Sequence, residues 1–211
     1  MRFPRARVAS AAAWIGAGLL LGLAGPVAGK FDNSACEALN VLFSGGWPWV
    51  GYAFLVGCFR RSRIESALLA ALGLVVGVVA YYLFKQLYPA LPAGVGAGPA
   101  ADVGISPQIL MWGAVALLFG APVGLAGNLA RTPGVGGLFF RLLVPLTAYV
   151  ETNQRLHAEA DVQHPVLGFT WAVSRAAACV VGAWLVGHTA WSWWRGRAEA
   201  GRTAGVPADR L

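Results

Sequence analysis

Charged side chains are scarce in this chain of 211 residues. Asp, Glu, Lys and Arg make up only 12% of the residues and hydrophobic residues make up 57%, whereas a typical soluble domain has about 25% charged residues. A soluble protein covers its surface with polar groups, so this composition argues against a water-soluble fold. It supplies enough apolar residues for several membrane spans of about 20 residues each.

Short motifs that carry common chemistry are also missing. The sequence contains no nucleophile elbow, phosphate-binding loop, HExxH zinc motif or paired intramembrane carboxylates. The three cysteines, Cys36, Cys58 and Cys179, form neither a CxxC pair nor a Cys/His zinc pattern, so we expect free thiols in apolar surroundings. We therefore predict no catalytic residue and no cofactor.

Six apolar segments, joined by more polar connections, organise the chain. Unpaired backbone groups are costly in hydrocarbon, so each segment must be helical. The pattern predicts an all-α integral membrane bundle of six transmembrane helices over residues 1–195, followed by a disordered polar tail at 196–211. The predicted spans cover residues 8–29, 39–59, 66–84, 109–129, 136–156 and 166–194.

Basic residues gather in alternate connections between these spans. If the N-terminus is cytoplasmic, most of the 16 basic residues lie inside, including those of the turn at 60–63, and only Lys30, Lys85 and Arg155 lie outside. The positive-inside rule then predicts a cell-membrane protein with both termini in the cytoplasm. The net charge of +7 is spread over these short groups, so we expect the lipid bilayer as a partner and no nucleic acid.

The first apolar segment admits a second interpretation. The sequence MRFPRAR, an apolar run and VAG before Lys30 resemble a cleavable signal peptide. The apolar run is longer than the usual core of a signal peptide, which favours a retained first span; cleavage would leave five spans.

A partial match between residues 14–29 and 112–127 would fit an inverted repeat, the plan of many transporters. The neighbouring spans, however, do not align at this offset.

Three segments resemble an uncharacterised family of small multi-pass membrane proteins from actinobacteria: NVLFSGGWPWVGYAFLVGCFRRS, ALGLVVGVVAYYLF and GAPVGLAGNLAR. The similarity covers about residues 39–131. That family pairs a Pro-Trp start of an early span with a short basic turn, followed by a span that ends in Tyr-Tyr and by a Gly-Pro-type span. The resemblance implies a membrane bundle and assigns no activity, ligand or catalytic residue.

One set of possible metal ligands lies at the outer end of the fifth span. On a helix, His157, Asp161 and His164 would share a face, and two imidazoles with a carboxylate can bind zinc or another divalent ion. A solvated helical hairpin has the same composition. We favour the hairpin, with the metal site as the alternative.

Arg175 is unusual because it lies within the sixth predicted span. In an antiparallel hairpin that turns at 163–165, a residue about ten positions after the turn faces one about ten before it. We therefore expect Arg175 near residues 151–155, in an ion pair with Glu151 or in contact with a ligand. The alternative is that its side chain reaches the lipid phosphates.

Glycine pairs recur at the GxxxG spacing that lets helices approach closely. We expect them to pack helices within one bundle; the alternative is a homo-oligomer, or another membrane protein, held through the same faces. The pairs are Gly18/Gly22, Gly25/Gly29, Gly73/Gly77 and Gly120/Gly124.

Three classes of function stay open on the sequence. A structural or accessory membrane protein is favoured, since no chemical motif stands out. A small transporter, or the substrate-binding subunit of one, is the alternative and would need a polar pocket open to the outside. An intramembrane enzyme comes last, because it would need ionisable residues that converge at one depth.

Overall fold

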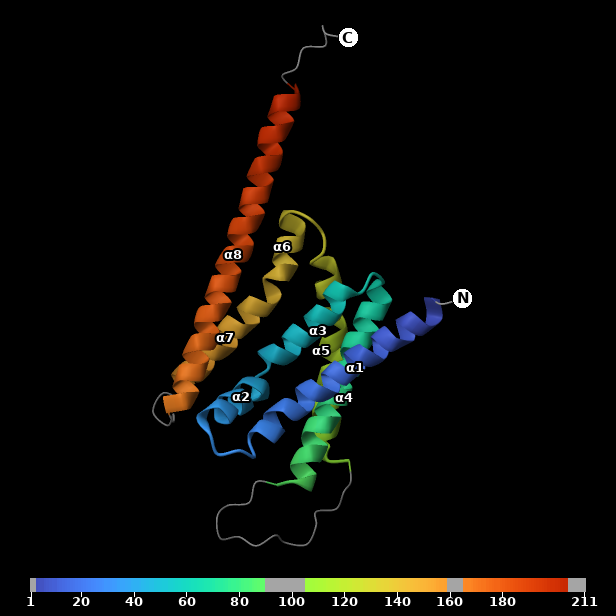
Figure 1. Ribbon diagram of the computed structural model, residues 1–211, viewed down its shortest axis with the longest axis vertical. Coiled ribbons are helices and arrows are strands. Elements are labelled where there is room, and N and C mark those ends of the chain that lie inside the picture. Colours follow the sequence, from blue (N-terminus) through green and yellow to red (C-terminus); the bar gives the residue numbers. More distant parts are fainter. Residues whose placement is uncertain (1–2, 90–104, 159–164, 205–211) are drawn as a thin grey trace.

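The computed structural model describes residues 3–89, 105–158 and 165–204. Within these ranges the chain forms helices and no strand, which confirms the predicted all-α class (Figure 1). The helices are α1 (Phe3–Ala28), α2 (Ser34–Ser44), α3 (Trp47–Phe59), α4 (Arg63–Leu87), α5 (Pro107–Leu129), α6 (Val135–Arg141), α7 (Leu143–Ala158) and α8 (Pro165–Ala204).

Five stretches of helix are long and apolar enough to cross a membrane. They are α1 from Val8, α4, α5, the consecutive helices α6 and α7, and α8. The bent pair of α2 and α3 supplies a sixth if it is counted as one span. The prediction of a multi-pass membrane bundle is confirmed, with five or six candidate spans.

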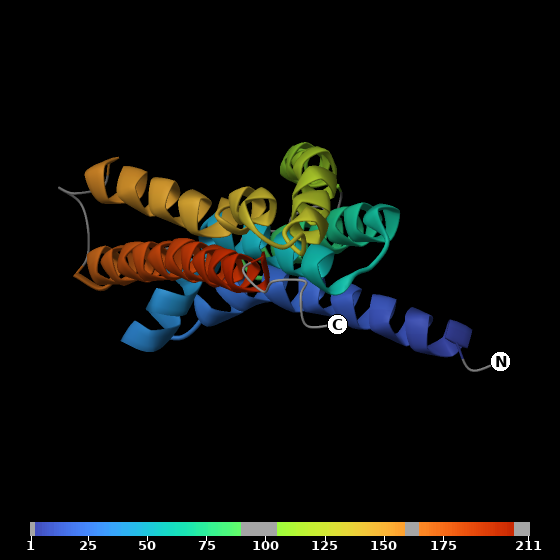
Figure 2. The same cartoon turned by 90° about the horizontal axis from the view of Figure 1, so that it is seen from above.

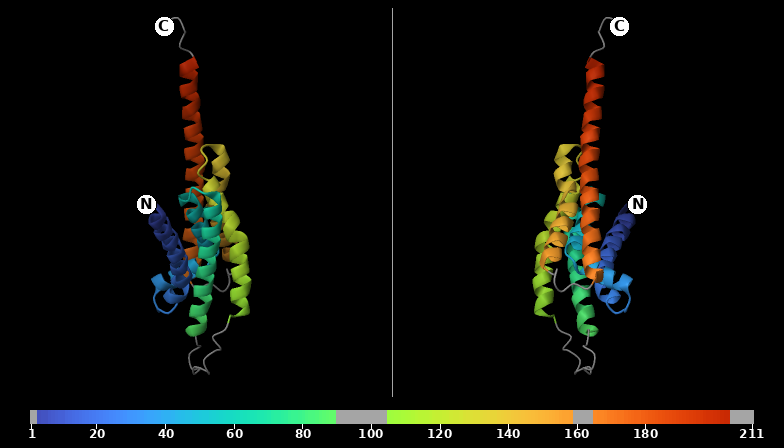
Figure 3. Two further views of the ribbon diagram at one scale, coloured as in Figure 1. Left: turned by 90° about the vertical axis from the view of Figure 1, so that its right-hand side faces the viewer. Right: turned by 90° about the vertical axis from the view of Figure 1, so that its left-hand side faces the viewer.

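The direction of the chain alternates from span to span, so that the connections gather at two ends of the bundle. Figure 1 shows the start of α1, the α3–α4 turn, the α5–α6 turn and the end of α8 toward one end. Figure 3 shows the same grouping from the two sides. We call this the basic end, because its turns and helix ends carry Arg60, Arg61, Arg63, Arg131, Arg141, Arg195 and Arg197.

The second predicted span, residues 39–59, is not one continuous helix. Helix α2 begins earlier, at Ser34, where the Asn33 side chain accepts a hydrogen bond from the Cys36 amide at 2.9 Å. Helix α3 begins after Gly45 and Gly46, at an angle of 66° to α2. Gly45 is extended and cannot continue α2, whereas Pro48 is tolerated in the first turn of α3 because a first-turn N–H has no intrahelical acceptor.

The fifth and sixth predicted spans also differ in detail. Residues 136–156 are divided at Leu142 into α6 and α7, since Pro145 has no N–H to donate to the carbonyl of Arg141. Helix α8 has 40 residues, which is about 60 Å of helix. It continues to Ala204, so the first part of the tail predicted as disordered is helical.

The core lies where α1, α3, α4 and α5 meet, seen from above in Figure 2. Its buried side chains include Val56 of α3 and Ala70 of α4, both fully inaccessible. The Tyr52 hydroxyl donates to the Trp14 carbonyl of α1 at 2.6 Å, which satisfies the one polar atom of this buried ring.

All four GxxxG pairs are used for packing inside the bundle. A Cβ at Gly18 or Gly22 of α1 would overlap the backbone of Gly73 or Gly77 of α4, so the two helices touch backbone to backbone. Gly120 and Gly124 pack on the backbone of α4 in the same way, whereas Gly25 and Gly29 lie mainly against side chains of α2, those of Phe43, Ser44 and Asn40. The preference for packing within one bundle is therefore confirmed, and these faces are not free to bind a partner.

We predict that Gly22→Val destabilises the protein by about 1–3 kcal/mol, because the new side chain must separate α1 from α4. Gly16→Val is the matched control on the same helix: no atom lies within 4 Å of its Cβ position. Its effect should stay within about 0.5 kcal/mol. Unfolding of both variants in detergent measures this difference, and equal losses would contradict the backbone contact.

Candidate functional site

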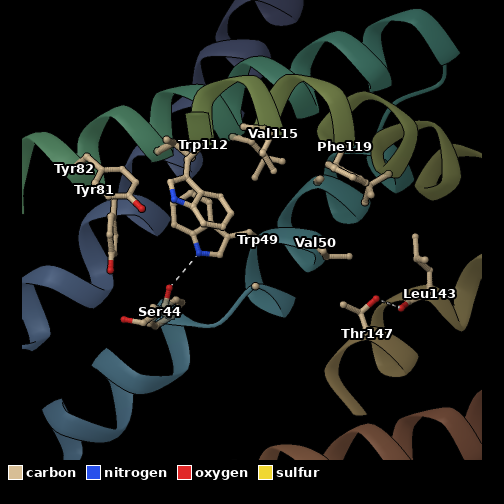
Figure 4. A pocket seen from close by; sticks show the side chains of 17 residues that line it. Ser44, Trp49, Val50, Tyr81, Tyr82, Trp112, Val115, Phe119, Leu143 and Thr147 are labelled. Atoms are coloured by element: carbon tan, nitrogen blue, oxygen red, sulfur yellow. Dashed lines mark hydrogen bonds between the residues drawn. The ribbon is translucent and has the colours of Figure 1, made fainter. Parts of the chain in front are cut away.

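A cavity of about 500 Å³ opens beside the break between α2 and α3. The end of α2 and helices α3, α4, α5 and α7 form its wall (Figure 4). None of the residues that line it is charged. Six aromatic side chains dominate the wall: Phe43, Trp49, Tyr81, Tyr82, Trp112 and Phe119.

Most polar groups of the wall already have partners in the protein. The Trp49 indole Nε1 donates to the Phe43 carbonyl at 3.1 Å, and the Thr147 hydroxyl donates to the Leu143 carbonyl at 2.8 Å. The Tyr81 hydroxyl accepts from Lys85 Nζ at 3.1 Å. These internal hydrogen bonds leave a cavity surface that is mainly apolar, although the bond from Lys85 does not use the O–H of Tyr81.

Helices α5 and α7 both contribute to the wall of the cavity. These two helices do not pack against each other in the described part of the chain, although both flank α3. Figure 4 shows Val115 and Phe119 of α5 across the cavity from Leu143 and Thr147 of α7.

The Glu151 carboxylate fixes the break beside this cavity. Its two oxygens accept hydrogen bonds from the backbone amides of Gly46 at 2.8 Å and Trp47 at 2.7 Å. These are the amides of the N-cap residue and of the first residue of α3; they lack intrahelical partners and lie at the positive end of the helix dipole. Because Gly46 has no side chain to cap the helix, a carboxylate from α7, more than 100 positions later, serves instead.

The surroundings of Glu151 support these two hydrogen bonds. Arg155, one turn further along α7, donates from Nε to the carboxylate at 3.2 Å. Its guanidinium also lies over the ring of Trp171, 4.9 Å from the centroid, and Trp171 is only 2% exposed. A Cβ on Gly45 would lie 3.2 Å from Glu151 Oε1, so the glycine allows the close approach. The junction thus joins α2, α3, α7 and α8.

Arg175 and Glu151, which we expected to pair, have different partners in the structure. Arg175 lies beside α7, within the range that the hairpin geometry predicts, and donates to Asn153 Oδ1 at 3.4 Å. The Glu151 oxygens are occupied by the amides of α3 and by Arg155. The partner from α3 lies outside the hairpin of α7 and α8. The one sequence signal for it is SGGWP, a helix start whose N-cap position, Gly46, has no side chain that can cap the helix.

The possible metal ligands are only partly within the described residues. His157 lies near the exposed end of α7, whereas Asp161 and His164 fall outside the described ranges. Among the residues that the structure describes, no three His, Cys, Asp or Glu side chains come together as a metal site would require. The metal site therefore stays a prediction.

The two arginines near Glu151 should differ in their energetic coupling to it. Glu151→Gln should cost about 1–3 kcal/mol, because it weakens charge-assisted hydrogen bonds to two amides. In a double-mutant cycle, Arg155→Gln should couple to it by about 0.5–1 kcal/mol, a small value because Arg155 is 36% exposed. Arg175→Gln should be additive within about 0.5 kcal/mol. Stronger coupling to Arg175 than to Arg155 would contradict the observed contacts.

Comparison with known proteins identifies no relative of this chain. No protein-family model, curated protein or solved structure matches the chain. The resemblance to the actinobacterial family thus depends on the quoted segments alone. What the structure establishes is an integral, multi-pass helical membrane protein with an apolar cavity at a broken helix.

Proposed function

We propose that the protein is an accessory membrane protein, not an enzyme, that binds a neutral molecule with a hydrocarbon or aromatic body. The ligand would occupy the cavity between α3, α4, α5 and α7. The single observation that carries this proposal is the uncharged, aromatic wall of the cavity, in which α5 and α7 do not pack against each other. The ligand would enter from the lipid between these two helices.

The size and composition of the cavity support this ligand class. A volume of about 500 Å³ falls within the range of small-molecule sites, which are concave, mainly apolar and rich in aromatic side chains. A charged ligand would lose its hydration on entry without gaining a counter-charge from the wall, which is strongly unfavourable. A neutral apolar ligand has no such cost.

The charge balance at the helix break supports the same conclusion. In many transporters the free amino end of a broken helix points at an anionic substrate. Here the amino end of α3 is already neutralised by Glu151, which in turn pairs with Arg155. The broken helix therefore leaves no positive site for an anion beside the cavity.

A substrate-binding subunit of a transporter is the second candidate. The broken helix next to a cavity favours it, since such breaks mark substrate sites in transporters. The polar pocket that we expected for this function would include Glu151 and Arg175, and neither lines the cavity. Transfer of a neutral fluorescent lipid between vesicle leaflets by the purified protein alone would favour transport over binding.

Filling the cavity should abolish ligand capture. We predict that Val50→Trp reduces photocrosslinking of a diazirine-bearing diacylglycerol, a neutral lipid, by about fivefold or more, because the indole takes up space that the ligand needs. The matched control is Leu55→Trp. Leu55 lies on the same helix, is 49% exposed and does not line the cavity. It should crosslink like the unmodified protein. Equal crosslinking of both variants would mean that the probe labels the lipid-facing surface only.

A second variant pair tests the same cavity from α5. Val115→Trp fills it from the opposite wall, and Leu118→Trp is its control on an exposed face, 68% accessible. If only the Val50 variant loses crosslinking, the ligand does not bridge α3 and α5, and the site as proposed is incorrect.

For the orientation, we propose that the basic end faces the cytoplasm, which places the N-terminus there. The concentration of arginines at one end supports this. In a variant without native cysteines, Ser62→Cys lies in the exposed α3–α4 turn and should react with an impermeant thiol reagent only in opened cells. Reaction in intact cells would reverse the orientation. A cysteine at position 97, outside the described residues, should give the opposite result.

A further inference from the structure

Arg60 lies at the basic end, where the turns between α3 and α4 and between α5 and α6 meet. It ends α3 and is only 9% exposed. Its backbone carbonyl accepts hydrogen bonds from Asn128 Nδ2 at 2.6 Å and from Arg131 Nη1 at 3.0 Å. These bonds hold the Arg60 backbone against the end of α5.

The side chain of Arg60 has donors without acceptors. Nε and Nη2 are both buried, and neither has a hydrogen-bond partner in the described part of the chain. These two atoms form one edge of the guanidinium, the edge that binds both oxygens of a carboxylate or phosphate at once. A buried guanidinium edge without an acceptor is unfavourable, so an oxyanion is the group that would satisfy it.

The neighbouring charges are of one sign. Arg61, Arg63 and Arg131 lie in the same two turns, and Glu65 is the only acid beside them. Within the described ranges, the one ion pair within 4.0 Å joins Arg155 and Glu151, on another part of the molecule. In the described part of the chain, therefore, none of these arginines forms an ion pair within 4.0 Å, although Glu65 lies near them in sequence.

We propose that Arg60 binds a phosphate oxyanion, supplied by the headgroup of an anionic phospholipid. Arg60 follows directly on the apolar helix α3, and lipid phosphates lie at the level where apolar spans end. Basic pockets between spans are known to bind anionic headgroups. The guanidinium edge of Arg60 is buried, so a lipid phosphate can reach it only after a small outward shift of the exposed turn at 61–64. This site is independent of the apolar cavity.

Lipid titration of the purified, full-length protein in detergent, followed by native mass spectrometry, tests the proposal. Phosphatidylglycerol should bind about tenfold more tightly than phosphatidylcholine, as expected for a charge-assisted bidentate contact. Arg60→Gln should remove about a tenfold factor in affinity for phosphatidylglycerol and leave phosphatidylcholine unchanged. The matched control Arg61→Gln, in the same turn but exposed, should change it less than about twofold.

Arg60→Lys keeps the charge but not the planar edge, so it should weaken binding by an intermediate factor. Circular dichroism tests whether each variant is folded. If Arg60→Gln does not fold, Arg60→Lys provides the affinity comparison in its place. Equal losses for Arg60→Gln and Arg61→Gln would indicate diffuse attraction and overturn the site. Equal affinity for the two lipids would do the same. Inorganic phosphate that binds as tightly as phosphatidylglycerol would overturn the lipid as the source.

Discussion

The contact between the Glu151 carboxylate and the first amides of α3 is the interaction on which the arrangement around the cavity depends. A helix that begins inside a membrane protein exposes amides that lipid cannot satisfy. Glu151 satisfies two of them at 2.8 and 2.7 Å, and Arg155 balances its charge. With these groups paired, α2 and α3 can meet at 66° instead of forming one straight span. The cavity lies directly beside this bend.

The rest of the bundle supplies a rigid frame for that bend. Glycines of α1 and α4 touch through their backbones, and those of α5 pack on α4 in the same way. Lipid is as apolar as the helices, so such close contact, more than burial of apolar surface, holds spans together. Helix α7 carries Glu151 but does not pack against α5, although both helices line the cavity. Tight packing on one side and a cavity on the other thus occur in the same molecule.

Much of the fold could be predicted from the sequence, for a clear physical reason. Spans of about 20 apolar residues, polar turns and small-residue spacing are local properties, and they gave the all-α bundle and its internal glycine contacts. The hairpin of α7 and α8 also placed Arg175 near Asn153, because this requires only a count of residues from the turn. The breaks at Gly45 and at Leu142 had local signals, in SGGWP and in Pro145, but their geometry depends on what packs around them.

The site could not be predicted, because its parts are distant in the sequence. Glu151 meets Gly46 across 105 positions, so no local pattern indicates the pair. The cavity depends on two helices that fail to touch, which has no sequence signature. The most direct test of the account is an experimental structure in nanodiscs that contain diacylglycerol. We predict density against Trp49 and Trp112, with Glu151 still bound to the amides of α3. A cavity closed by contact between α5 and α7, or a ligand bound to Glu151 in place of those amides, would contradict it.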